Sequence, residues 1–254
     1  VIYVTVDRRL PSCSDSRDSL TYTVYSSGDV FVKSTLIPAT GMGELLRVGN
    51  RIQLDGSLEN MTWYGRGESD SYSDRKAGYD VGLYNSTVSD QFTKFLYPQE
   101  TGNKTDVRFM ALTDEDGNGL LVDAVDHLLS MSALHYTQED LEQAGHIHEL
   151  EGTDNTVVTI DYAQMGLGTA SCGPAALPQY RLSASQNYTY TYHLKALSGE
   201  SAEQIMEMSK VTVTDETNLL TGIQVGGEEI EDFRTDMTYY AVDLSNVGDD
   251  IPQV

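Results

Sequence analysis

Trp63-Tyr64-Gly65-Arg66-Gly67 is the stretch that decides the fold of this chain. It holds the only tryptophan, and its two glycines flank an arginine directly after two large aromatic residues. Tryptophan and tyrosine bury a large apolar area and carry a polar group that usually finds a partner. Glycine adopts backbone angles that a residue with a Cβ resists. The pattern indicates a strand end that leads into a long, ordered loop.

Two polar segments follow this stretch, Tyr72-Ser73-Asp74-Arg75 and Pro98-Gln99-Glu100-Thr101-Gly102-Asn103. Asp74 and Arg75 can pair with each other or with loop backbone. We interpret the segments together as a structural corner of a β-sandwich. A fold feature does not by itself indicate a function, so this simpler interpretation is favoured. A sugar-binding lip is the alternative, since tryptophan, tyrosine, arginine and aspartate suit the faces and hydroxyls of sugars. Composition alone does not separate the two interpretations.

Length and charge restrict the classes of partner. The 254 residues suffice for one large β domain or two smaller ones. Sixteen lysines and arginines stand against 39 acidic residues, a formal net charge of −23, which disfavours nucleic acids and anionic membranes. No run is long and apolar enough to span a membrane, and residues 1–6 are strand-like rather than a signal peptide. For Cys13 and Cys172, two isolated thiols are favoured, and a disulfide stays open.

The apolar and β-branched runs predict an all-β chain of antiparallel strands. Ser26-Ser27-Gly28-Asp29 lies between two such runs and indicates a hairpin turn, whereas residues 7–19 are polar and typical of turns. Gly49 suggests a bulge within its strand. The predicted strands cover residues 1–6, 20–25, 30–37, 47–54, 107–112, 119–122, 157–162, 180–185 and 188–197.

Three segments raise the question of metal binding. Asp114, Asp116 and Asn118 resemble the start of an EF-hand loop, but Val125 stands where a bidentate glutamate is needed, so a hairpin turn is favoured. Residues 137–144 predict a helix that Thr137 caps. His146 and His148 follow at a spacing that suits a metal pair on a strand, yet no third ligand is evident. We therefore predict structural histidines bonded to loop backbone, and no metal site.

The segment Met165-Gly166-Leu167-Gly168 through Ser171-Cys172-Gly173-Pro174 is a glycine-punctuated loop, too long for a hairpin turn and typical of functional loops. Cys172 lacks an evident base beside it and is not predicted to be a nucleophile. Composition changes after Leu197. We predict a β domain over residues 1–197, a linker with a short helix over 198–210, and a truncated immunoglobulin-like β module over 211–254.

In this order and at these separations, the motifs resemble the C-terminal small-chain domain, domain 5, of the large bacterial β-galactosidases of glycoside hydrolase family 2. The resemblance covers about residues 1–197. It implies an antiparallel β-supersandwich similar to galactose mutarotase, here without its first strands. The residues that carry the structural motif are Trp63, Tyr64, Gly65, Arg66, Gly67, Tyr72, Asp74, Arg75, Pro98, Gln99, Glu100, Gly102 and His148. One departure is Glu68-Ser69-Asp70, where the family usually has Pro-x-Glu, so that Asp70 would supply the acidic contact.

The resemblance also implies the function. Family enzymes are retaining glycosidases that hydrolyse terminal β-D-galactosides with two glutamates of a catalytic barrel. The small-chain domain carries neither glutamate, stabilises the barrel, lends one loop to the edge of the active site and is inactive alone. Ser171, Cys172 and Gly173 are the expected substrate-edge residues, with Cys172 where some members place a stacking tryptophan. The parent enzymes often use Mg and Na in other domains, and no cofactor is expected in this chain.

The expected partners are the catalytic barrel and the other domains of the parent enzyme, and galactoside would bind only in the full enzyme. Whether copies of the chain associate with one another stays open. The compartment also stays open, although an immunoglobulin-like tail favours an extracellular or cell-surface location. Two other functions remain as alternatives. A free-standing carbohydrate-binding module would use Trp63. A mutarotase-like enzyme would need an acid and a base, for which His146 or His148 with Glu100 or Glu149 are the candidates.

Overall fold

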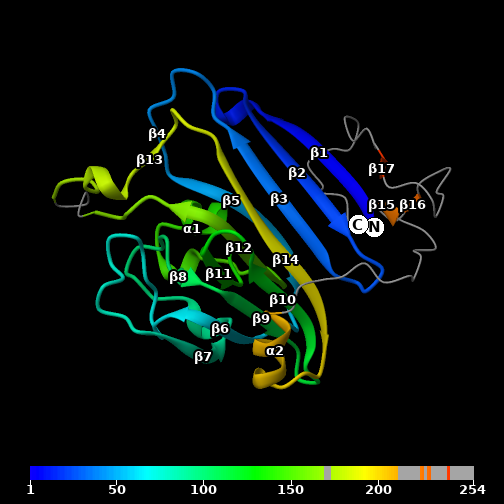
Figure 1. The fold of residues 1–254 in the computed structure, drawn as a ribbon. Coiled ribbons are helices and arrows are strands. Elements are labelled where there is room, and N and C mark those ends of the chain that lie inside the picture. Colours follow the sequence, from blue (N-terminus) through cyan, green and yellow to red (C-terminus); the bar gives the residue numbers. More distant parts are fainter. Residues whose placement is uncertain (169–172, 211–223, 226–227, 230–238, 241–254) are drawn as a thin grey trace.

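Two β-sheets packed face to face form the body of the molecule in a computed structural model that describes residues 1–168, 173–210, 224–225, 228–229 and 239–240 (Figure 1). The larger sheet has nine strands in the order β17-β1-β2-β3-β14-β10-β9-β6-β7. Its strands are β1 (Ile2–Leu10), β2 (Ser16–Val24), β3 (Val30–Ile37), β6 (Asn60–Arg66), β7 (Val81–Thr87), β9 (Phe109–Thr113), β10 (Asn118–Ala124), β14 (Tyr188–Ser198) and β17 (Tyr239–Tyr240).

The smaller sheet has four strands in the order β5-β12-β11-β8. They are β5 (Arg47–Asp55), β12 (Asn155–Gln164), β11 (Leu129–Leu134) and β8 (Lys104–Val107). Two further pairs join β4 (Glu44–Leu45) to β13 (Leu182–Ser183) and β15 (Gln224–Val225) to β16 (Glu228–Glu229). Among the strands described, all pairings are antiparallel except that of β1 with β17. The predicted antiparallel all-β sandwich is therefore confirmed.

The helices are short. They are α1 (Gln138–Gln143), α2 (Ala202–Met208) and the 3-10 turns η1 (Pro11–Cys13), η2 (Ser89–Gln91), η3 (Ile147–Glu149) and η4 (Pro178–Tyr180). Thr137 caps α1 as predicted, in a reciprocal pair of hydrogen bonds with Asp140. In the described part of the chain, no helix has the length and apolar character needed to cross a membrane.

The main hydrophobic core lies between the two sheets. Apolar side chains of the nine-stranded sheet meet those of the four-stranded sheet, and most are fully buried, as in Val32, Trp63, Leu112, Val122, Met131, Val158 and Ile160. Alternation along each strand directs every second side chain into this layer. The burial of apolar area here supplies the main free energy that holds the sheets together.

A second, smaller core covers the outer face of the nine-stranded sheet. In β9, Met110 and Leu112 point into the main core, whereas Phe109 and Ala111 point to the other side. There Ile205 of α2 packs against them, and α2 lies across this end of the sheet (Figure 1). The continuous apolar run of β9 follows from burial on both faces.

Two expectations about the first strands have different outcomes. The hairpin between β2 and β3 is confirmed, with Gly28 at a φ of 83° in its turn. Residues 7–19, in contrast, form a loop only at 11–15, because β1 and β2 continue past the core and pair as far as Leu10 and Ser16. Backbone ladder bonds and the cross-strand ion pair of Arg8 with Asp18 hold this polar extension without apolar burial.

The strand expected at 180–185 also differs from its prediction. Pro178 starts the turn η4, so that only Leu182–Ser183 pair as a strand, with Glu44–Leu45. Most of the region assigned to an immunoglobulin-like module, 211–254, lies outside the described residues. In the parts described, Tyr239–Tyr240 pair in parallel with Tyr3 and Val4 of β1.

Candidate functional site

The glycine-rich loop leaves β12 at Gln164 and is held in place by the Asp74-Arg75 pair. The Asp74 carboxylate accepts the backbone N–H groups of Leu167, at 3.1 Å, and Gly168, at 2.7 Å. The Arg75 guanidinium donates to the carbonyl of Gly168 at 2.7 Å. Hydrogen bonds that involve ionised groups are about twice as strong as neutral ones. Of the two pairings that the sequence leaves open, the structure has the one with loop backbone.

Two loop positions require glycine. A Cβ on Gly166 would lie 2.8 Å from Asp74 Cγ and 2.8 Å from Tyr180 Cβ. Gly168 has a φ of 62°, and a Cβ there would lie 2.5 Å from the backbone nitrogen of Ala176. Larger residues would push the loop away from its anchor, because the second contact is with backbone that cannot rotate aside.

Trp63 and Arg66 form the corner from which the anchoring segment starts. The Trp63 side chain is 1% exposed and its indole stacks on Tyr84, with ring centroids 5.4 Å apart. Arg66 is bonded to Asp106 and to the backbone carbonyls of Lys76, at 3.2 Å, and Tyr79, at 2.7 Å. The face of Trp63 is therefore occupied by the core, which supports the structural corner and leaves no indole platform for a sugar.

The two polar motifs pair with each other through Ser71 and Asn103. The Ser71 N–H donates to the Asn103 carbonyl at 2.8 Å, and the Asn103 side-chain amide donates to the Ser71 carbonyl at 2.8 Å. Gly102, at a φ of 76°, lets the 98–103 turn close onto this pair. Residues 71–75 and 98–103 thus form one unit, and the unit carries the loop anchor.

Next to this unit, the Arg47 guanidinium forms ion pairs with two carboxylates, those of Glu100 and Asp161. Arg47 lies 2.8 Å from a Glu100 oxygen and 3.2 Å from an Asp161 oxygen. Gln164 donates to Asp161 at 3.3 Å and to the Asn103 side-chain carbonyl at 3.0 Å. Burial raises the pKa of Asp161 to about 7, in spite of the nearby Arg47 charge. Burial also raises the pKa of Glu100 above its usual value.

The sequence analysis missed Arg47, Asp161 and Gln164 as members of this site. They meet because β5 and β12 pair so that Asp161 stands opposite Gly49, a contact that no local pattern reveals. A Cβ on Gly49 would lie 1.9 Å from Asp161 Oδ1. The register shift predicted at Gly49 falls instead on the partner strand, between Asp161 and Ala163. Two features of the sequence could have indicated this site: Asp161, a charged residue at the end of an apolar run, and Gly49, a glycine within a strand.

Lys104 joins the site to the tryptophan corner. Its residue is 1% exposed, its ammonium lies 5.0 Å from the Trp63 ring centroid, and it donates to the Glu68 carbonyl at 3.0 Å. Burial lowers the pKa of Lys104 to about 8, and the charge of Asp70 opposes the shift. Asp70, which the resemblance suggested as the acidic contact, therefore acts electrostatically on a buried lysine.

A cleft of about 340 Å³ opens beside the loop anchor at one end of the four-stranded sheet. The residues that line it include Ser73, Lys76, Asn103, His127, Tyr162 and Gln164. The His127 and Tyr162 rings are stacked with centroids 4.0 Å apart, and the buried Ser73 hydroxyl oxygen has no hydrogen-bond partner within the described residues. The residues next to the loop and to its anchor, Gln164 and Ser73, therefore border a hollow lined by both polar and apolar side chains.

The structure describes only some of the other predicted site residues. Ser171 and Cys172 lie outside the described residues, Gly173 is exposed, and Cys13 is a half-buried free thiol. His148 has a 79% exposed side chain, and His146 bonds to the Glu149 side chain at 3.1 Å rather than to loop backbone, which corrects that prediction. Glu100 is bound to Arg47, so it is not free to act as a base beside these histidines.

The segments that raised metal binding have other contacts in the structure. The Asp114 carboxylate accepts the backbone N–H groups of Asp116, at 2.9 Å, and Asn118, at 2.8 Å, as in a hairpin turn. Across the ranges of the chain that the structure describes, no group of three or more histidine, cysteine, aspartate or glutamate side chains is arranged to hold an ion.

The comparison with known families decides the assignment. The family described as β-galactosidase small chain matches residues 2–194. The chain belongs to the β-galactosidase small-chain family. A β-galactosidase of Priestia megaterium is 35% identical over 197 residues, 77% of this chain and 18% of that protein. A β-galactosidase of Streptococcus thermophilus is 30% identical over 198 residues, 78% of this chain and 19% of that protein.

A third relative, a β-galactosidase of Lactobacillus delbrueckii subsp. bulgaricus, is 35% identical over 169 residues, 66% of this chain and 16% of that protein. The chain thus spans about a fifth of the length of these relatives. The family match over residues 2–194 contains the tryptophan corner, the loop anchor and the buried charges described above.

Proposed function

We propose that the chain is the accessory small-chain domain of a larger retaining β-galactosidase, in which it stabilises the catalytic barrel. Its glycine-rich loop forms part of the edge of the galactoside site, and the chain alone does not hydrolyse galactosides. The family match over residues 2–194 and the small share of each relative that the chain covers support this proposal.

The observation that supports a functional role for the glycine-rich loop is its anchoring by Asp74 and Arg75. Loops that contribute to binding are held by a rigid scaffold. Asp74 and Arg75 fix the backbone at 167–168 from a separate segment, which itself rests on the buried unit of Ser71 and Asn103. The following residues, 171–173, would reach the substrate edge from this fixed point.

Catalysis by this chain's own carboxylates has little support. Asp161 is 1% exposed and Glu100 is held by Arg47, so the two do not flank a space for a sugar ring. The alternative of a carbohydrate-binding module requires an exposed Trp63 indole on which a sugar can stack, and Trp63 is buried. The alternative of a mutarotase-like activity requires an acid and a base beside one sugar. His146 and His148 are surface residues paired with Glu149 and do not provide this arrangement.

The test is Asp74→Ala in the full-length enzyme that contains this chain, assayed with a chromogenic β-galactoside. We expect kcat/KM to fall about tenfold or more, since a misplaced positioning loop weakens transition-state contacts. Asp116→Ala, an exposed aspartate in the β9–β10 turn, is the matched control and should leave kcat/KM unchanged. An Asp74→Ala enzyme with unaltered kcat/KM and unaltered stability would remove the loop from the substrate edge.

A further inference from the structure

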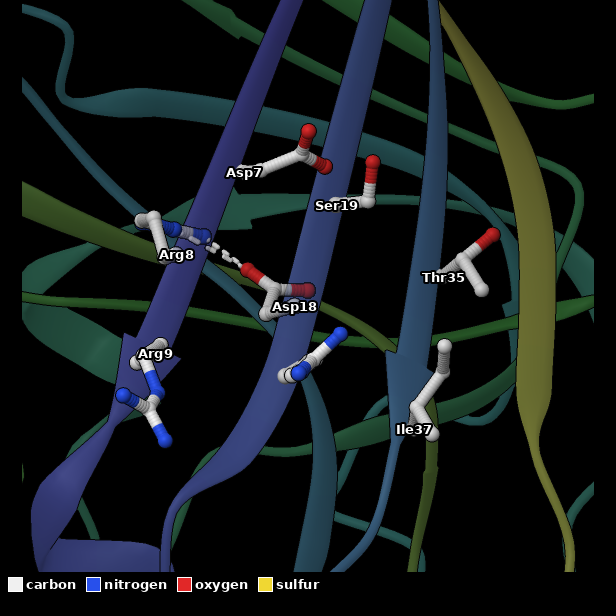
Figure 2. A pocket seen from close by; sticks show the side chains of 8 residues that line it. Asp7, Arg8, Arg9, Asp18, Ser19, Thr35 and Ile37 are labelled. Carbon is white, nitrogen blue, oxygen red and sulfur yellow. Dashed lines mark hydrogen bonds and ion pairs between the residues drawn. The ribbon is translucent and has the colours of Figure 1, made fainter.

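An arginine-lined hollow of about 430 Å³ lies on the β1–β2–β3 part of the large sheet, away from the glycine-rich loop. Its lining includes Arg9 and Arg17. Asp7, Ser19 and Thr35 also line it; they pair across the three strands and form a row two residues away from the row of Arg9 and Arg17. Figure 2 shows Arg9 on β1 beyond Asp7, and Ser19 and Thr35 on the neighbouring strands. The hollow is large enough for a monosaccharide-sized ligand.

The strand register places like charges directly opposite each other. Arg9 pairs with Arg17 across β1 and β2, and Arg17 pairs with Ile37 across β2 and β3. Opposed like charges destabilise a sheet unless something neutralises them. Both arginines are exposed, in a chain whose formal net charge is −23. A local cationic pair on so acidic a protein is therefore a distinct feature of this surface.

The carboxylates nearby do not neutralise the pair. Asp18 is engaged by Arg8, whose Nε donates to it at 3.0 Å, and Figure 2 shows this contact as a dashed line. Asp7 lies one row away on the same strand face. In the part of the chain that the structure describes, neither Arg9 nor Arg17 has an ion-pair partner. Two exposed guanidinium groups without an ion-pair partner in the described residues thus line one hollow.

We propose that this hollow binds an oxyanion, a carboxylate or a phosphate, carried on a small hydroxyl-bearing molecule. Guanidinium groups bind both anions through paired N–H donors. Ser19 and Thr35 offer hydroxyls, and Asp7 offers an acceptor for ligand hydroxyls in the adjoining row. The site is independent of the glycine-rich loop and of any activity of the parent enzyme.

Calorimetric titration of the isolated chain at low ionic strength tests the proposal with three probes. They are inorganic phosphate, glucuronate, and glucose as the neutral counterpart of glucuronate. We expect millimolar or tighter binding of at least one anion and at least tenfold weaker binding of glucose. Binding of phosphate alone assigns the site to phosphate esters, and binding of glucuronate alone assigns it to sugar carboxylates.

The double variant R9Q/R17Q should weaken anion binding at least tenfold. Lys33→Gln removes an exposed cation from the same sheet outside the hollow, and it should change the affinity less than twofold. The proposal is overturned if neither anion binds better than glucose, or if Lys33→Gln weakens binding as much as the double variant does. Circular dichroism of each variant establishes that the strands remain folded.

Discussion

Arg47 is the residue that pairs with the buried Asp161 and with Glu100. It holds Glu100 and Asp161 at once, and Asp161 keeps one carboxylate oxygen, Oδ1, without a hydrogen-bond partner in the described residues. An ionised carboxylate in such a place is poorly solvated, which is why its pKa rises. Protonation of this network therefore changes stability.

Asp161→Asn should remove part of the pH dependence of unfolding. The folded-state pKa of Asp161, about 7, lies above its ordinary value of 3.8, so the folded protein binds the proton more tightly and this group's contribution to stability falls as pH rises from about 4 to 7. A shift of this size corresponds to roughly 4 kcal/mol at most, at about 1.4 kcal/mol per unit. Urea unfolding at several pH values measures it.

In this experiment the wild-type protein should lose free energy of unfolding between pH 4.5 and 7.5 relative to Asp161→Asn. Glu100, whose pKa is also raised, keeps a remaining slope of the same sign in the variant. Parallel pH profiles for the two proteins would contradict the assignment of a raised pKa to Asp161.

Trp63→Ala should lower the free energy of unfolding by about 3–5 kcal/mol, as large-to-small changes of buried aromatic residues do. The indole is buried in the main core and stacks on Tyr84, and the buried Lys104 ammonium lies over it. Chemical denaturation followed by circular dichroism measures the loss. Unchanged stability together with a loss of sugar affinity would restore the indole as a binding platform.

At the scale of elements, the extension of β1 and β2 beyond the core is held by ladder bonds and charge pairs. The two cross-strand pairs there have opposite characters: Arg8 faces Asp18, whereas Arg9 faces Arg17. One pair supports the extension and the other opposes it, which makes the two a matched comparison within one hairpin.

Arg17→Thr should raise the free energy of unfolding by about 0.2–1 kcal/mol at low salt, because it removes an opposed like charge and introduces a residue that suits strands. The gain should shrink as NaCl screens the repulsion. Arg8→Thr is the control and should lower stability through loss of the Asp18 pair. Destabilisation by Arg17→Thr would show that Arg17 has a stabilising partner in solution.

The elements also show what sequence reasoning can reach. Local alternation predicted most strands, and turn chemistry at Gly28 and Asp114 and the cap at Thr137 identified short-range structure correctly. Pairing of Asp74 and Arg75 with loop backbone was one of two options, but the sequence did not indicate that the glycine-rich loop supplies this backbone. The Arg47–Asp161 network was not foreseen, because it depends on the register of two strands more than a hundred residues apart.

At the scale of the whole molecule, two sheets enclose one core, and α2 closes part of the outer face. The loop anchor, the ion pairs of Arg47 and the cleft lie together at one end of the four-stranded sheet, next to the loop that we propose for the edge of the galactoside site. This arrangement suits a domain that presents one fixed loop to a neighbour rather than one that performs the chemistry itself.

The most direct test of this account is the turnover of a chromogenic β-galactoside by three proteins: the isolated chain, the full-length enzyme that contains it, and that enzyme without residues 2–197. The account predicts turnover by the full-length enzyme, none by the isolated chain, and at least a hundredfold loss in the deleted enzyme. Turnover by the isolated chain, or full activity of the deleted enzyme, would contradict it.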